Sequence, residues 1–145
     1  MNAEYLGHSC YVDTNVFIYL FDNTAGQKHI IAKETYKSLI KSGLGFISIL
    51  VVSEWRNVMI RKYNTLIDND VRLEFLKLFE IWNPALISLE TILEAENLSK
   101  RFCLSPFDSL HVQSALDQRC KYFLSEDMQD GLLINDRLKI VNPFK

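Results

Sequence analysis

The sequence is poor in the residues that build cross-linked or segmented folds. Its 145 residues include only three cysteines, three prolines and five glycines. The cysteines are odd in number and widely spaced, and no two form a C-x-x-C pair, so neither a disulfide framework nor a zinc-binding motif is indicated. Proline and glycine do not gather in any one stretch, so no linker divides the chain. We therefore expect a single domain over residues 1–145, in the reducing environment of the cytoplasm.

Long apolar runs and an excess of basic residues are also lacking. The longest stretch without a charged residue, residues 42–53, is shorter than the roughly 20 residues that a membrane-spanning helix needs. The N-terminal segment has an acidic residue and no basic stretch before its apolar part, which argues against a signal peptide. The formal net charge of −2 excludes the basic excess of a general polyanion binder. Any contact with nucleic acid must therefore come from a local patch.

The stretch YVDTNVFIYLFD, residues 11–22, places a carboxylate between two apolar runs. The residues before Asp13 are typical of a short buried strand, and Thr14 or Asn15 is then expected to cap a helix. An unpaired carboxylate in apolar surroundings suffers a large desolvation penalty or becomes protonated. Asp13 therefore needs a cation or hydrogen-bond donors beside it.

Strand-like and helix-like patterns alternate along the chain. Strands are predicted over residues 9–13, 44–50, 85–90, 121–127 and 138–144. Helices are predicted over residues 14–22, 26–41, 51–62, 66–82, 91–104 and 105–120. Gly43 is a natural stop signal after the second helix, and Ser105 with Pro106 is a typical helix start. Strands separated by long helices favour parallel βαβ units, so we predict a three-layer α/β/α fold around a mostly parallel sheet of four or five strands.

Four acidic residues are expected at one rim of this sheet, because ligand sites in such folds lie beyond the carboxyl ends of the strands. Asp13 and Asp127 each close a predicted strand. Glu54 and Asp108 lie near the starts of predicted helices, where an acid also has a purely structural role through the helix dipole. Carboxylates brought together repel one another, and a hard divalent cation such as Mg²⁺ or Mn²⁺ is the usual solution. Such an ion activates water and holds a phosphate, which favours phosphodiester hydrolysis.

Five stretches of the chain carry a resemblance to a known family. They are VDTNVFIYLFD, FISILVVSEWRNVM, SPFDSLHVQSAL, FLSEDMQDG and VNPF, and they follow the family's order over nearly the whole chain. The chain resembles the PIN-domain ribonucleases, and among them the small single-domain toxins of the VapC type. The resemblance implies a Mg²⁺- or Mn²⁺-dependent endoribonuclease, whose catalytic and metal-binding acids are Asp13, Glu54, Asp108 and Asp127.

The resemblance also assigns supporting residues and partners. Asn15 and Ser125 match positions where the family places polar residues that support the acidic cluster, and Ser125 keeps the hydroxyl of the commoner threonine. Asp130 is a candidate ligand of a second ion, although the sequence DMQDG is equally typical of a surface turn. Toxins of this class are usually encoded with an antitoxin that inserts a basic side chain at the acidic site, and they tend to form homodimers. RNA, an antitoxin and a second copy are the partners that the resemblance implies.

Three basic residues follow Glu54 on the same predicted helix, namely Arg56, Arg61 and Lys62. They are candidates for contacts with RNA phosphates, which position a strand without reading its bases. A solvated helix face is the alternative interpretation. Both interpretations remain open on the sequence alone.

His111 lies three residues after Asp108, on the same side of the predicted helix, so that the two residues form a D-x-x-H pair. No second histidine or cysteine lies at ligand spacing from it, and apolar residues flank it. A structural role is therefore favoured, and His111 is left out of the predicted site.

A haloacid-dehalogenase-like phosphatase also starts from an aspartate after a first strand, and a receiver-like phosphoacceptor domain shares a Mg²⁺ site of acids at strand ends. A haloacid-dehalogenase-like phosphatase needs D-x-D-x-[TV], whereas this chain has Asp13, Asn15 and Phe17 and so lacks the second carboxylate. A receiver-like domain needs an acidic pair at the first strand and a lysine after the last, and neither is evident. A catalytically silent PIN-like module that binds RNA or protein stays open as the alternative to a nuclease, and metal-dependent cleavage distinguishes the two.

Overall fold

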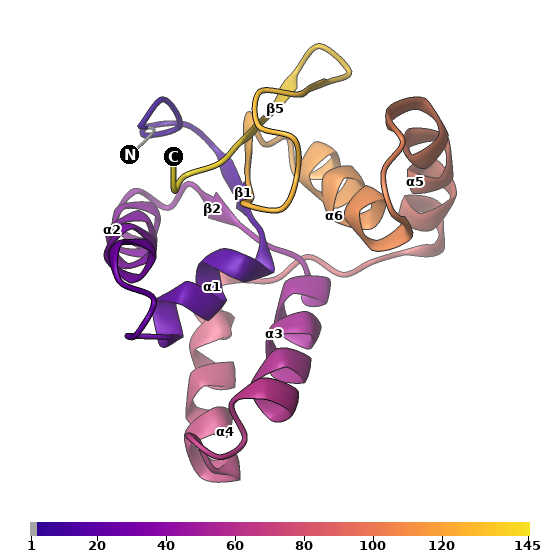
Figure 1. Ribbon diagram of the computed structural model, residues 1–145. Coiled ribbons are helices and arrows are strands. Elements are labelled where there is room, and N and C mark those ends of the chain that lie inside the picture. The colour runs from indigo at the N-terminus through magenta and orange to yellow at the C-terminus, as the bar shows by residue number, and fades with distance from the viewer. Residues whose placement is uncertain (1–2) are drawn as a thin grey trace.

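The computed structural model describes residues 3–145 and contains a central sheet with helices on both sides (Figure 1). Among these residues, five strands are hydrogen-bonded in the order β2-β1-β3-β5-β4. They are β1 (Cys10–Val12), β2 (Gly45–Phe46), β3 (Tyr122–Leu124), β4 (Leu133–Ile134) and β5 (Leu138–Val141). The pairs β1–β2, β1–β3 and β3–β5 are parallel, and β4 pairs antiparallel with β5. The predicted α/β/α fold with a mostly parallel sheet is confirmed.

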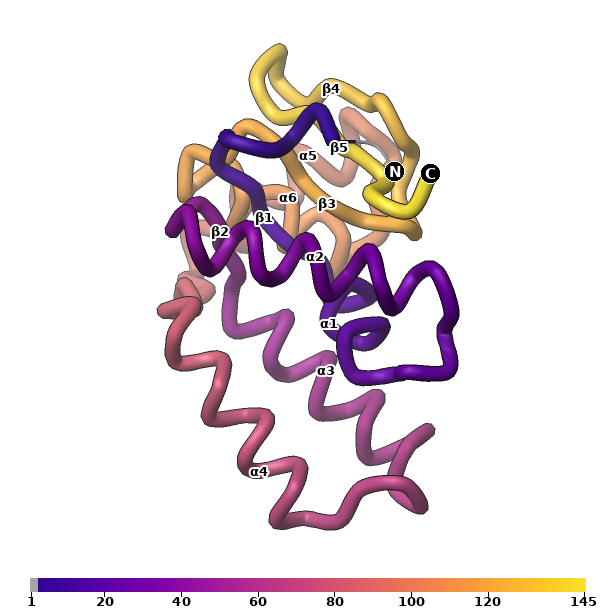
Figure 2. The backbone as a smooth tube through the Cα atoms, turned by 90° about the vertical axis from the view of Figure 1, so that its left-hand side faces the viewer, coloured from indigo at the N-terminus to yellow at the C-terminus, as the bar shows by residue number. Residues whose placement is uncertain are grey.

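Helices connect the strands and cover the sheet. They are α1 (Thr14–Phe21), α2 (Gln27–Ser42), α3 (Ile49–Lys62), α4 (Asn69–Leu78), the 3-10 helix η1 (Phe79–Trp82), α5 (Leu89–Phe102) and α6 (Pro106–Asp117). Helix α2 lies on one side of the sheet, and α5 and α6 pack together on the other (Figure 1). Helices α3 and α4 lie side by side and project away from the sheet as an arm, as both views show (Figures 1 and 2). No helix within residues 3–145 has the length and apolar character needed to cross a membrane.

Most helix ends lie where the sequence predicts them. The Ser105 hydroxyl accepts a hydrogen bond from the Asp108 N–H at the start of α6, and Gly43 ends α2 in the left-handed conformation. The prediction that Thr14 or Asn15 caps α1 was wrong. The cap is Asp13, whose extended backbone and short carboxylate suit that position, and whose side chain accepts from the Thr14 N–H.

Three segments differ from the predicted strands. Ile49 and Leu50, predicted as the end of the second strand, begin α3, because Ser48 caps that helix. Residues 85–90 form no strand: Ala85 makes a single parallel bridge with Ser48, and Ser88 already caps α5. Strand β4 was not predicted, because two residues are too few to show an alternating pattern. The predicted helix over residues 66–82 is divided into α4 and η1, and Asn83, in the left-handed conformation, ends it.

The middle of the sheet is fully buried and holds the rim in place. Tyr11 of β1 and Phe123 of β3 stack with ring centroids 5.1 Å apart, and neither side chain is exposed. At the edge, Gly45 of β2 lies so close to Trp82 that a Cβ atom built on the glycine would lie 2.2 Å from the indole ring. The two β1 neighbours, β2 and β3, thus fix the strand that leads into Asp13.

Candidate active site

Asp13 lies where β1 ends and α1 begins, and only 7% of its surface is exposed. Its Oδ1 accepts a hydrogen bond of 2.7 Å from the Thr14 N–H, and its Oδ2 accepts one of 2.7 Å from the Ser125 hydroxyl. Burial raises the pKa of Asp13 above its ordinary value, although nearby His111 and these two hydrogen bonds act in the opposite direction. Asp13 is therefore a buried carboxylate with one donor on each oxygen.

Asp127 is joined to Asp13 through two polar side chains. The Ser125 Oγ, which donates to Asp13, also accepts the Asp127 N–H at 3.1 Å. The Asn15 Nδ2 donates to Asp127 Oδ2 at 3.1 Å and to Ser125 Oγ at 3.3 Å. Because β1 and β3 are parallel neighbours, their carboxyl ends deliver these residues to one edge. The structure therefore brings together Asp13, Asn15, Ser125 and Asp127.

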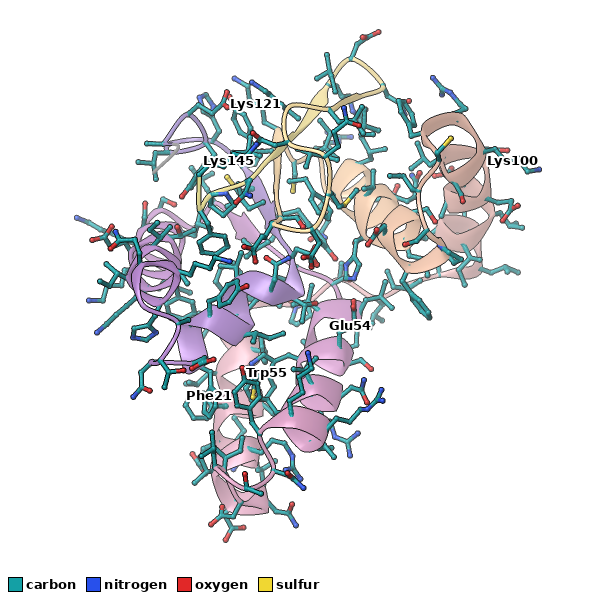
Figure 3. All side chains as sticks on the ribbon, viewed as in Figure 1. Phe21, Glu54, Trp55, Lys100, Lys121 and Lys145 are labelled. Carbon is teal, nitrogen blue, oxygen red and sulfur yellow. The ribbon has the colours of Figure 1, made fainter. Side chains whose placement is uncertain are left out.

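Glu54 reaches the same region from the half of α3 that lies nearest α6 (Figure 3). Its side chain is 42% exposed, and its Oε1 is hydrogen-bonded to Nε2 of His111, which is 2% exposed. The other ring nitrogen of His111, Nδ1, lies 2.8 Å from the Tyr11 hydroxyl. The Tyr11 hydroxyl in turn lies 2.8 Å from the Ser48 hydroxyl. A continuous chain of polar contacts thus runs from the core to Glu54.

Asp108 lies in the first turn of α6, one turn before His111, and is half-buried. Burial by itself would lower the pKa of His111. The hydrogen bond to Glu54 and the charges of Asp13, Glu54 and Asp108 outweigh burial, and the pKa of His111 is raised. Three of the four predicted acids therefore act electrostatically on this one imidazole. His111 was not among the predicted site residues, although its D-x-x-H spacing from Asp108 was the signal that could have included it.

The donor set suits a hard divalent cation in its chemistry. Carboxylate oxygens are the ligands that Mg²⁺ and Mn²⁺ prefer, and the buried Asp13 is the kind of charge that such an ion would compensate. Within residues 3–145, no three histidine, cysteine or acidic side chains are close enough together to hold a metal ion by themselves. Mg²⁺ commonly takes one or two carboxylates and keeps several waters. The arrangement therefore fits an ion bound by few direct protein ligands.

Asp130 has its contacts elsewhere. Its Oδ1 accepts the Asn142 N–H at 2.8 Å, and its Oδ2 lies 3.3 Å from Lys145 Nζ. The hydrogen bond from Asn142 is the main cause of a lowered pKa of Asp130, with the ammonium of Lys145 adding to it. These contacts account for Asp130 as the acid of a surface turn.

Glu126, which lies between Ser125 and Asp127, is held by two contacts that sequence reasoning missed, here called the Glu126 clamp. Glu126 forms an ion pair with Lys28 of α2 and accepts a hydrogen bond of 2.5 Å from the Tyr19 hydroxyl of α1. Burial raises the pKa of Glu126, but these contacts outweigh burial and the pKa is lowered. The backbone that carries Asp127 is thereby tied to α1 and α2.

The three basic residues of α3 point to solvent. Arg56, Arg61 and Lys62 are all exposed, and none forms an ion pair with another residue in the described part of the chain. They share their helix with Glu54. Their charges are therefore free to contact a polyanion that reaches the rim.

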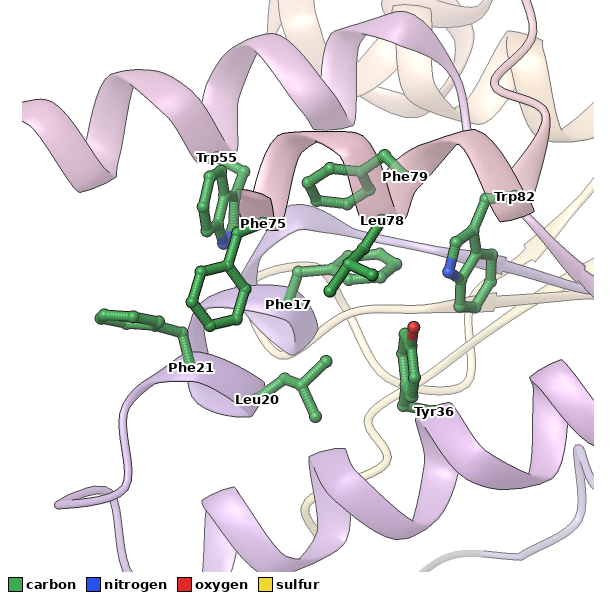
Figure 4. A pocket seen from close by; sticks show the side chains of 9 residues that line it. All are labelled: Phe17, Leu20, Phe21, Tyr36, Trp55, Phe75, Leu78, Phe79 and Trp82. Atoms are coloured by element: carbon green, nitrogen blue, oxygen red, sulfur yellow. The ribbon is translucent and has the colours of Figure 1, made fainter. Parts of the chain in front are cut away.

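An apolar pocket lies between α1, α2, α3 and the α4–η1 segment (Figure 4). Its volume is about 130 Å³, and it is lined by Phe17, Leu20, Phe21, Tyr36, Trp55, Phe75, Leu78, Phe79 and Trp82. None of the lining residues is acidic or basic, so the pocket offers no ligand for a cation. It is separate from the acidic residues.

Comparison with known proteins agrees with this architecture. The family model described as PIN domain matches residues 10–129. Among solved structures, a chain of a toxin-antitoxin complex from Klebsiella pneumoniae matches with a TM-score of 0.67 over 93% of this chain and 98% of that chain, at 17% sequence identity. At this identity the match shows a shared fold. A search of curated proteins found no match.

Proposed function

The chain belongs to the PIN domain family, and from this premise we propose that it is a metal-dependent endoribonuclease that hydrolyses RNA phosphodiester bonds. PIN domains are generally nucleases, and the matched residues 10–129 include all four acids of the candidate site. The observation that carries the proposal is the buried carboxylate of Asp13, joined to Asp127 through Ser125 and Asn15. A fold that needed only a core would not keep this charge buried at a strand end.

Of Asp13, Glu54, Asp108 and Asp127, one or two would bind Mg²⁺ or Mn²⁺ directly, and the others would act through its water ligands. When bound, such an ion lowers the pKa of a water ligand and neutralises charge on a phosphate. The role of Asn15 and Ser125 is orientation. Asn15 fixes one oxygen of Asp127, and Ser125 fixes one oxygen of Asp13, so neither carboxylate must be ordered when substrate arrives. The expected products carry a 3′-hydroxyl and a 5′-phosphate, and a 2′,3′-cyclic phosphate would contradict this chemistry.

Arg56, Arg61 and Lys62 are the proposed contacts to RNA phosphates. They are exposed on the helix that carries Glu54, so an RNA that contacts them lies close to the rim. Contacts of this kind set the position and register of the strand without reading its sequence.

We assign the protein the role of toxin in a type II toxin–antitoxin pair, acting in the cytoplasm. The shared fold with a chain of a toxin-antitoxin complex supports this role. The antitoxin would cover the acidic site with a basic side chain, and the active form would be a homodimer. A gene for a small DNA-binding protein beside the gene for this chain, and its co-purification with the chain, test the pairing.

The nuclease itself is tested with labelled RNAs, tRNAs included, incubated with purified protein in Mg²⁺, Mn²⁺ or EDTA. Cleavage is expected in either metal and absent in EDTA. Asp13→Asn should abolish it, because asparagine still caps α1 but carries no charge. Asp70→Asn, an equivalent change at an exposed position of α4, is the matched control and should cut like the wild type. A folded, inhibitor-free protein that binds metal but cuts nothing would instead establish a binding module.

A further inference from the structure

Glu54 is held by a histidine that the family resemblance does not assign to the site. His111 is a buried residue of α6, yet its Nε2 contacts the Oε1 of Glu54 on α3. We propose that His111 is a positioning residue, which fixes the carboxylate of Glu54 in the orientation that binds the divalent cation. This inference rests on the proposed function, because it takes Glu54 as a metal ligand.

The direction of the hydrogen bonds follows from the groups involved. A carboxylate only accepts, so the proton between the two residues belongs to His111 Nε2. In the neutral imidazole Nδ1 accepts from the Tyr11 hydroxyl, whose oxygen then accepts from Ser48, whereas in the imidazolium Nδ1 donates to the Tyr11 oxygen. In both protonation states the Nε2–H points to Glu54. His111 therefore delivers one N–H to a single oxygen of the carboxylate.

The residues that hold Glu54 are buried, whereas the side chain of Glu54 is partly exposed. Tyr11 and Ser48 have no exposed surface, and His111 also makes an edge contact with the Tyr11 ring at 5.8 Å between centroids. Glu54 has three rotatable side-chain bonds and is 42% exposed, so without the imidazole it would sample many rotamers. Binding of Oε1 restricts these rotamers in advance. No residue in the range 3–145 donates a hydrogen bond to Oε2, which stays available as a ligand.

A histidine that merely fills the core would make a different pattern of effects. Its removal would lower stability, and any effect on metal binding would be independent of Glu54. A positioning residue acts only through its partner, so removing both should cost no more metal affinity than removing Glu54 alone. The two roles are separated by a double-mutant cycle.

Calorimetric titration with Mn²⁺ alone would be carried out on the wild type, Glu54→Ala, His111→Leu and the double variant, each checked for folding by circular dichroism. Each single variant is expected to bind Mn²⁺ about 10-fold to 100-fold more weakly, and the double variant no more weakly than Glu54→Ala. His111→Gln, whose amide keeps an N–H donor, should recover most of the affinity and remains informative where leucine impairs folding. Additive losses, or an unchanged affinity in His111→Leu, would overturn the inference.

A second readout separates this inference from the proposed function. Imidazole ¹⁵N spectra of the metal-free protein report the His111 Nε2–H directly, and Glu54→Ala should shift that signal. An unshifted signal would overturn the inference whatever the metal affinity is. If Glu54→Ala shifts the signal but the wild type binds no Mn²⁺, the metal-dependent function is overturned instead. The role of His111 in positioning a metal ligand is then overturned with it.

Discussion

Ser125 donates a hydrogen bond of 2.7 Å to Asp13, although 112 residues separate the two along the chain. The contact is possible because β1 and β3 are adjacent and parallel, so that the residues just beyond their ends meet. It places a neutral donor against the most buried of the four acids. The parallel pairing of β1 and β3 thus supplies the hydrogen-bond donor for the Asp13 carboxylate, and that donor is Ser125.

Removal of the Ser125 hydroxyl should lower the free energy of unfolding, whereas replacement of Ser125 by threonine should have little effect. In Ser125→Ala the buried oxygen of Asp13 loses its donor, so we expect a loss of about 1–3 kcal/mol in the free energy of unfolding and a further rise in the pKa of Asp13. Ser125→Thr keeps the hydroxyl and should retain most of the stability and cleavage. Urea unfolding of both variants measures the difference. Equal stability of Ser125→Ala and wild type would show that the bond contributes nothing.

The approach of β2 to η1 should tolerate no side chain at position 45. A Cβ atom there would lie 2.2 Å from the Trp82 ring, and the ring is buried, so the backbone or the indole must move. Overpacking of this kind typically costs about 1–3 kcal/mol, and Gly45→Ala should therefore lower Tm. Combining it with Trp82→Phe should cost less than the sum of the two single changes. Strict additivity would contradict the steric explanation.

The parts of the site that follow strand ends could be predicted from the sequence. Asp13 and Asp127 each follow a short apolar run, and Ser105 with Pro106 is a local helix start, so neighbouring residues alone carry the information. The α/β/α class follows equally from the alternation of patterns. Which residues support the acids was suggested by the family resemblance, and the contacts of Asn15 and Ser125 are known from the structure.

The contact between Glu54 and His111 could not be predicted in the same way. The two residues lie 57 positions apart on different helices, and their meeting depends on how α3 and α6 pack against β1. A buried histidine flanked by apolar residues also fits a core position equally well. The clamp of Glu126 by Lys28 was missed for a similar reason, because 98 residues separate the two. Strand β4 was missed because it is only two residues long, although its partner β5 follows closely in the sequence.

The clamp on the Asp127 segment should make stability depend on pH. The pKa of Glu126 is lowered in the folded protein, so its contribution to stability is present above the ordinary glutamate pKa of about 4.3 and is lost as the pH falls through the lower folded-state pKa. Glu126→Gln should therefore be less stable than wild type at pH 7, and the difference should disappear in acid. Unfolding free energies at several pH values measure it. A difference that is independent of pH would exclude the ion pair as its cause.

The contribution of the basic residues of α3 to RNA binding should show in the salt dependence of that binding. If Arg56, Arg61 and Lys62 contact RNA phosphates, changing all three to glutamine should weaken binding of a single-stranded RNA to the uncleaving Asp13→Asn protein. It should also reduce the slope of log K against log salt concentration by about 2, since each phosphate contact to a single strand contributes roughly 0.7. Lys33, Lys37 and Lys41 are exposed basic residues of α2, and the same triple change there is the matched control, because it alters net charge equally but away from Glu54. Equal effects of the two triple variants would mean that RNA responds to overall charge, and the α3 face would then be only a solvated surface.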